Sequence, residues 1–218
     1  MNTIKKVFNS DHANTYDQKA KKSNWLDPRI IFGLTYEYIE PGESVLDIGI
    51  GTGLSSELFY RAGLKIYGLD FSPEMLACCA AKNMTADLKE HDLHNTPYPF
   101  DTDSIDHAVC TGVTHLFSDI GPILGEVSRI TRLNGFFSFV VPHCKDGESR
   151  VKHVSPLYAP SENFSMYSYP DSTVQALIKK HGFAPIHELL FEASSIAHQH
   201  AHYKAYVIQN KKDGGISL

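Results

Sequence analysis

The sequence predicts an α/β fold in which a doubly wound, mostly parallel sheet is covered by helices on both faces. Short apolar stretches alternate with helical stretches along most of the chain, the pattern typical of such sheets. In addition, an apolar stretch at residues 44–48 runs into Gly49, Gly51 and Gly53 ahead of a helical stretch. This strand, glycine turn and helix form the unit that opens nucleotide-type α/β domains.

Seven strands and five helices are expected. The strands are placed at 44–48, 64–69, 86–91, 104–110, 136–141, 183–191 and 203–209, and the helices at 27–39, 54–62, 73–83, 120–131 and 171–181. Asp27 and Ser72 each precede a proline, so both are expected to cap a helix N-terminus. Residues 145–170 show little periodicity and are predicted to be a long functional or mobile loop.

The glycine spacing and two acids indicate the kind of cofactor. Asp47 ends the first strand, and Asp70 ends the second, 21 positions after Gly49, where a ribose-binding carboxylate is expected. Dinucleotide-binding turns usually read G-x-G-x-x-G and bind a pyrophosphate. Here the pattern is D-x-G-x-G-x-G, and an acid beside the turn repels phosphate but attracts an amine. A ligand with a ribose, a positive charge and no phosphate is S-adenosylmethionine (SAM), and an NAD-dependent oxidoreductase is disfavoured.

Composition sets limits on domain count and partners. The 218 residues, 42% hydrophobic, suit one domain over 1–218, and a net charge of −5 gives no basic footprint for nucleic acid. No segment reads as a membrane span or signal peptide, so a cytoplasmic location is expected. The four cysteines have neither zinc-ligand spacing nor a disulfide pattern, and no metal site is predicted.

Four segments resemble the successive motifs of small class I SAM-dependent methyltransferases: 45–54, 68–76, 91–106 and 126–141. Residues 15–20 and 112–116 look most like the Williams–Beuren-region type, with the tellurite-resistance type a more distant relative. The resemblance implies a strand order of 3-2-1-4-5-7-6 with the last strand antiparallel. It also implies an N-terminal helical cap at 1–40 and a substrate lid at 145–170.

The resemblance further implies a cofactor site. Asp47 and Gly49 would meet the methionine portion of SAM, Gly51 and Gly53 would allow close backbone approach, and Asp70 would accept bonds from the ribose hydroxyls. The remaining positions are Phe71 and Met75 beside the adenine, Asp92 and Leu93 at the adenine edge, Thr111 and Gly112 near the amine, and Tyr16 over the methionine end.

The chain has 12 histidines, and the candidate general bases are among them. His115, after the fourth strand, is the leading base or orienting group, and His143 a weaker one; a packed histidine is the alternative for His115. The alternating His198, His200 and His202 suit a solvated hairpin, a substrate contact or a metal site. Aromatic residues of the predicted loop, Tyr158, Phe164, Tyr167 and Tyr169 with Met166, would form a lid with Tyr16 and Trp25, or a packed cluster.

The absence of two motifs bears on the methyl acceptor. The chain has no Asp/Asn-Pro-Pro-Tyr/Phe motif for methylating amino groups of bases and no Pro-Cys pair for cytosine chemistry. A small organic acceptor is therefore favoured over nucleic acid. A protein acceptor stays open, as does a SAM-binding sensor or partner subunit without transferase activity.

Overall fold

A computed structural model describes residues 10–23, 25–154, 164–193 and 201–212. Its core is a seven-stranded sheet in the order β3-β2-β1-β4-β5-β9-β8, and only β9 runs antiparallel to its neighbours. The fold class and the order 3-2-1-4-5-7-6 are thereby confirmed, β8 and β9 being the sixth and seventh strands of this sheet. The strands are β1 (Ser44–Ile48), β2 (Lys65–Asp70), β3 (Thr85–Glu90), β4 (His107–Cys110), β5 (Phe136–Pro142), β8 (Phe183–Ala193) and β9 (Ala201–Asn210).

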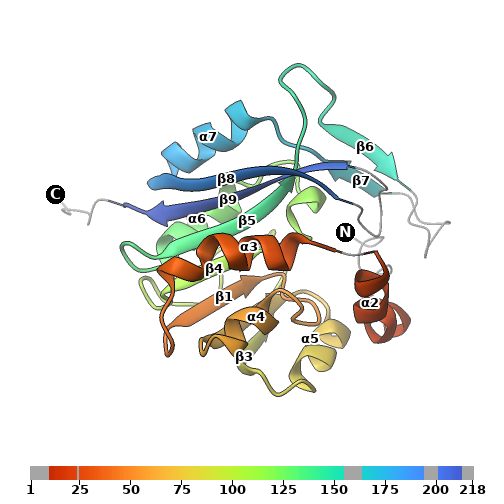
Figure 1. The fold of residues 1–218 in the computed structure, drawn as a ribbon, viewed down its shortest axis with the longest axis vertical. Helices are drawn as coiled ribbons and strands as arrows, with labels where there is room; N and C mark the ends of the chain where they lie inside the picture. The colour runs from red at the N-terminus through yellow and green to blue at the C-terminus, as the bar shows by residue number, and fades with distance from the viewer. Residues whose placement is uncertain (1–9, 24, 155–163, 194–200, 213–218) are drawn as a thin grey trace.

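Helices cover both faces of the sheet (Figure 1). One face packs on α6 (Gly121–Ile130) and α7 (Asp171–Lys180), the other on α3 (Asp27–Thr35), α4 (Ser56–Arg61) and α5 (Pro73–Ala80). In β1, Leu46 and Ile48 join the first apolar cluster and Val45 joins the second, because successive side chains of a strand point to opposite faces. The central strands β1, β4 and β5 are buried on both faces, which is why they are mostly apolar and lack apolar–polar alternation.

Two further segments of regular structure lie at the carboxyl ends of the parallel strands. Helix α2 (Ser10–Lys22) lies at this edge of the sheet, and so does a two-stranded ribbon of β6 (Val151–Val154) and β7 (Phe164–Tyr167) (Figure 1). The ribbon falls within 145–170, so the expectation of a loop without regular structure was wrong there. Its pairing depends on residues on either side of a chain reversal, a contact that local periodicity does not report.

Several boundaries also differ from the expected ones. The helix after the glycine turn begins at Ser56, and α3 ends at Thr35 and continues as one 3₁₀ turn, η1 (Tyr36–Tyr38). The N-cap of α3 is Leu26, without a side-chain cap; Asp27 is buried in the first turn, so its predicted capping role was wrong. Ser72 does cap α5, accepting a bond from Met75 N at 3.2 Å.

No helix among the described residues has both the length and the apolar character needed to cross a membrane.

Candidate cofactor and active site

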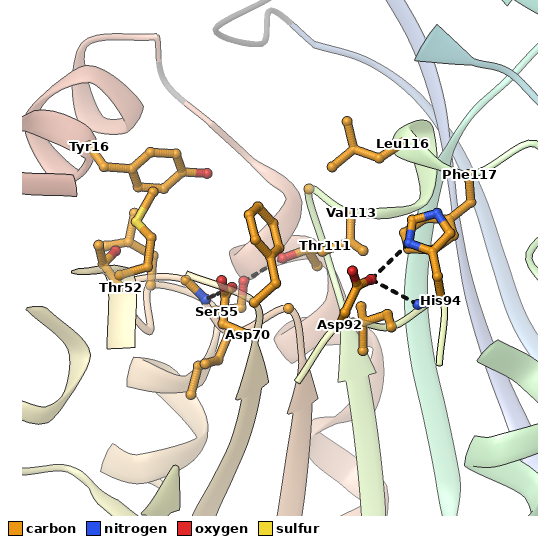
Figure 2. A pocket seen from close by; sticks show the side chains of 18 of the residues that line it. Tyr16, Thr52, Ser55, Asp70, Asp92, His94, Thr111, Val113, Leu116 and Phe117 are labelled. Carbon is orange, nitrogen blue, oxygen red and sulfur yellow. Dashed lines mark hydrogen bonds and ion pairs between the residues drawn. The ribbon is translucent and has the colours of Figure 1, made fainter. Parts of the chain in front are cut away.

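A cavity of about 410 Å³ opens at the carboxyl ends of β1, β2 and β4. This is the switch point of the sheet, where the strand order reverses and where open α/β sheets bind ligands. The glycine turn, the residues after β2, β3 and β4, helix α2 and strand β7 all line it. In Figure 2, Tyr16 reaches over the cavity from α2, while Asp92 and His94 lie on the opposite side.

Most of the predicted cofactor residues meet in this cavity. Ten of the twelve line it: Tyr16, Gly49, Gly51, Asp70, Phe71, Met75, Asp92, Leu93, Thr111 and Gly112. Asp47 and Gly53 are not among its lining residues. The cofactor roles of all twelve stay predictions, and the structure supplies the geometry on which to test them.

The three glycines of the turn have positive φ angles of 74°, 53° and 85° at Gly49, Gly51 and Gly53. A Cβ on Gly49 would lie 2.3 Å from Val113 Cγ2, and one on Gly53 would lie 2.1 Å from Met84 Cε. A Cβ on Gly51 would meet nothing within 4 Å, although Gly51 lines the cavity. Gly49 and Gly53 are therefore required by packing, whereas the missing side chain of Gly51 leaves room for a ligand to approach the backbone.

Asp70 is 7% exposed, and both of its carboxylate oxygens accept backbone bonds. Oδ2 accepts from Gly51 N at 2.8 Å and Oδ1 accepts from Ser72 N at 2.9 Å. Burial raises the pKa of this carboxyl, and the backbone N–H donors oppose that rise. The backbone of Phe71 hydrogen-bonds to this carboxylate as well. A carboxylate has about four acceptor positions, so about one position remains for a further donor such as a ribose hydroxyl. Asp70 thus joins the glycine turn to the ligand position.

Asp47 lies beneath the turn instead of in the cavity wall. It is 1% exposed, and its Oδ2 accepts from Ser56 Oγ at 2.7 Å. Burial raises its pKa to about 7, the bond from Ser56 opposes the rise, and the nearby Asp70 carboxylate adds to it. An ammonium group bound above the turn would favour the ionised form, so this acid can respond to a cationic ligand without touching solvent.

Helix α2 is fixed over the cavity by one carboxylate that sequence reasoning did not single out. Asp17 accepts from Thr52 Oγ1 in the glycine turn at 2.6 Å and pairs with Lys82 Nζ at 2.6 Å. Tyr16, its neighbour, lines the cavity and packs edge-on against Trp25 at 6.4 Å between ring centroids. These contacts place an aromatic cover above the turn.

Trp25 also covers the cavity, and a buried acid holds its side chain in place. Gly112 has a φ of 67°, which favours glycine, and a Cβ there would lie 3.2 Å from Trp25 Cζ2, so a larger residue would press on the indole. The Trp25 side chain also hydrogen-bonds to Asp27, whose pKa burial raises to about 6. Asp27 is therefore a positioning group for the cavity wall.

Asp92 is engaged by His94, a residue the sequence analysis did not consider. Asp92 Oδ1 accepts from His94 N at 3.1 Å and from His94 Nδ1 at 2.9 Å. The His94 ring stacks on Phe117, with centroids 4.6 Å apart and planes at 24°, and both line the cavity (Figure 2). The two-residue spacing from an Asp is a local turn signal, but the stacking partner is distant in sequence.

The other histidine candidates lie elsewhere. His115 lies on the 3₁₀ turn η2 (Thr114–Leu116). It does not line the cavity described above, although its neighbour Leu116 does, and it does not line the second cavity at this edge of the sheet. His143 and His202 line that second cavity. His198 and His200 lie outside the described residues. Within the described part of the chain, no three metal-ligating side chains gather.

The predicted lid residues divide among three places. Phe164 and Tyr167 line the main cavity, and Met166 and Tyr167 the second one. Tyr169 is fully buried, and its hydroxyl donates to Thr114 O at 3.2 Å, so it is a core residue. Tyr158 lies outside the described residues.

The sheet order, the glycine turn at its switch point and the acid that ends β2 define the fold of class I SAM-dependent methyltransferases. A family model described as a methyltransferase domain matches residues 46–139, from β1 into β5. A solved SAM-dependent methyltransferase from Methanosarcina mazei has a TM-score of 0.72 at 14% identity, over 83% of this chain and 98% of that one.

Two curated relatives are similar in sequence. The chain is 27% identical over 150 residues to the 18S rRNA (guanine(1575)-N(7))-methyltransferase of Saccharomyces cerevisiae. The aligned region covers 68% of this chain and 54% of that protein. It is 35% identical over 128 residues to a malonyl-(acyl-carrier protein) O-methyltransferase of Pectobacterium atrosepticum, with 58% and 48% covered. The chain spans about half the length of these relatives. Residues 46–139 thus match a methyltransferase domain, and the chain has the fold of solved SAM-dependent methyltransferases.

Proposed function

We propose that the protein transfers a methyl group from SAM to a small organic acceptor. The observation that carries this proposal is the cavity at the switch point, in which Asp70 faces the ligand space beside a glycine with an unobstructed Cβ direction. A carboxylate suits a ribose diol, and the open side of Gly51 suits close approach by the cofactor.

The transfer chemistry asks little of the protein beyond alignment. SAM supplies a methyl group on a sulfonium, which is already an activated leaving group. Asp70 would hold the ribose, and Thr111, tied to Ser55 by a hydroxyl–hydroxyl bond, would fix the chain after β4 beside the methionine portion. Tyr16 and Trp25 would exclude water above the reacting atoms. Fixing the acceptor in line with the methyl group is the main catalytic contribution.

Tyr16 and Trp25 line the cavity and pack against each other, so they restrict access to the cofactor and favour a small acceptor. Similar proteins include a demethylmenaquinone methyltransferase and malonyl-(acyl-carrier protein) O-methyltransferases. Because one similar protein is an 18S rRNA methyltransferase, transfer to a nucleic acid is the second candidate function. We also propose that the protein is of the Williams–Beuren-region type, because residues 15–20 and 112–116 resemble that type.

The decisive experiment measures cofactor binding and turnover separately. Calorimetry with S-adenosylhomocysteine tests the site, and mass spectrometry of S-adenosylhomocysteine formed from SAM with a fractionated metabolite extract tests transfer. Turnover with the small-molecule fraction supports the proposal. Binding without turnover in any fraction favours a SAM-binding sensor, turnover with RNA alone favours the second candidate, and no binding overturns the assignment.

A further inference from the structure

A second cavity of about 390 Å³ lies at the same edge of the sheet, beyond β4. We call it the distal cavity. It is lined by the end of β5, the start of β9, the β6–β7 ribbon and residues 148–149. Because β9 is antiparallel, its first residues lie at the carboxyl ends of the parallel strands. The two cavities are therefore neighbours along one edge.

Strand β7 separates the two cavities. Phe164 and Ser165 line the main cavity, Met166 and Ser168 line the distal cavity, and Tyr167 lines both. The chain after β7 is fixed beside the end of β5, since Tyr169 N donates to Pro142 O at 2.8 Å. Tyr167 is thus a single side chain between two spaces of nearly equal size.

The volumes indicate where an acceptor must extend. Ligand pockets for one drug-sized molecule run from roughly 300 to 1,000 Å³, so a main cavity of about 410 Å³ is nearly filled by one cofactor. With the ribose at the end of β2 and the methionine portion at β1 and β4, the acceptor must approach from the side of β5. The distal cavity is the described space on that side.

The lining of the distal cavity favours an anion. Lys152, His143 and His202 reach it from three different segments, and Glu148 is the only carboxylate in the described lining. Glu148 is engaged with the backbone, because its Oε2 accepts from Lys145 N at 2.9 Å. Among the described residues, no carboxylate lies within ion-pair distance of Lys152 or His202.

The orientation of His143 agrees with this. Its Nδ1 is buried without a hydrogen-bond partner in the described part of the chain, 3.8 Å from Asp171 Oδ1. The side chain is 16% exposed, and the residue lines the distal cavity. An imidazole N–H at this cavity can donate to an oxyanion.

We propose that the distal cavity binds an anionic group of the methyl acceptor, a carboxylate or a phosphate, through Lys152, His143 and His202. The acceptor then spans both cavities past Tyr167, with its nucleophile beside the methyl group and its anionic end in the distal cavity. This inference rests on the proposed function for its role in transfer, but the anion site itself exists independently of turnover.

The first test uses the full chain with S-adenosylhomocysteine bound and two probes, inorganic phosphate and acetate, which distinguish the two anion sources. Histidine ring resonances are followed by NMR at constant pH and ionic strength. Saturable shifts of His143 and His202 are expected with at least one probe, and Lys152→Gln should weaken that binding about tenfold, the loss of one charge-assisted contact. Lys179→Gln is the matched control, since it removes the same charge from the exposed far end of α7.

The inference is overturned if neither histidine responds to either probe, or if Lys179→Gln weakens binding as much as Lys152→Gln. A second test compares turnover of carboxylated or phosphorylated acceptors with that of their uncharged esters. Lys152→Gln should raise KM for the anionic acceptors about tenfold and leave KM for SAM unchanged. Equal use of uncharged esters refutes the inference while the proposed function stands, whereas anion binding without any SAM turnover refutes the function alone.

Discussion

The glycine turn offers a paired prediction, because Gly51 and Gly53 have similar backbone angles but different surroundings. Gly51→Ala places a methyl group in open space beside the ligand position. The positive φ of 53° costs an L-residue about 1–2 kcal/mol, and the lower entropy of the unfolded chain returns about 0.4–1 kcal/mol. The expected loss of stability is therefore about 0–1.6 kcal/mol, which lowers Tm by at most about 6 °C in a chain of this size.

Gly53→Ala adds a collision to the same backbone strain. Its Cβ would lie 2.1 Å from Met84 Cε and 2.8 Å from Cys79 Sγ. The terminal methyl of Met84 can move, but Cys79 is fully buried in α5 and cannot yield without a shift of the helix. Overpacking of this kind costs about 1–3 kcal/mol. Added to the net backbone cost of about 0–1.6 kcal/mol, the total of about 1–4.6 kcal/mol lowers Tm by about 2–18 °C.

The order of the two variants should reverse for cofactor affinity: the variant that is less destabilised should bind the cofactor more weakly. Gly51→Ala should weaken S-adenosylhomocysteine at least about tenfold, about 1.4 kcal/mol, and Gly51→Val should abolish binding. Gly53→Ala should keep near-normal affinity at temperatures where it is folded. Thermal unfolding without ligand and calorimetry with ligand separate the two effects. Normal affinity in a folded Gly51→Ala protein would refute the view that the ligand approaches this backbone.

Further outcomes are expected at four more residues. Asp70→Ala should weaken SAM and S-adenosylhomocysteine by roughly 1.5–3 kcal/mol, the value of a charged hydrogen bond, and unchanged calorimetric affinity would exclude the ribose contact. Because burial raises the Asp47 pKa to about 7, the folded state holds a proton that the unfolded state releases, so this group's contribution to stability falls as pH rises from about 4 to 7. Affinity for the cationic ligand should fall as pH is lowered below about 7, and Asp47→Asn should flatten that profile; a profile identical to the wild type would place the amine elsewhere. Asp17→Ala should speed S-adenosylhomocysteine release in stopped-flow measurements, since it frees α2 from Thr52, and an unchanged rate would show that α2 does not limit exchange. His115→Ala should leave cofactor affinity nearly intact while lowering transfer about 10²–10⁴-fold if it is a base, and full activity would return it to a packing role.

The sequence by itself determined the turn and the fold class around it. Gly49, Gly51 and Gly53 stand where the backbone takes positive φ, a conformation that only glycine adopts at little cost. Asp70 is the last residue of its strand, as the sequence predicted, so its place at the cavity was predictable. Alternation of strands and helices fixed the doubly wound class, and the family resemblance supplied the strand order, which local pattern does not encode.

Only the tertiary structure decided which face Asp47 takes. Every residue of β1 is buried, so its sequence lacks the apolar–polar alternation that would reveal the inward side. The structure places its carboxyl under the turn on Ser56, outside the cavity lining.

The remaining features depend on residues far apart in the chain. Asp17 meets Thr52 and Lys82, His94 stacks on Phe117, and Tyr167 divides two cavities. Local periodicity indicates which face of a helix or strand is apolar. It carries no information about which distant side chain will pack against that face. The sequence therefore determined the cofactor turn, and the packing of α2 and the β6–β7 ribbon decided the shape of the space around it.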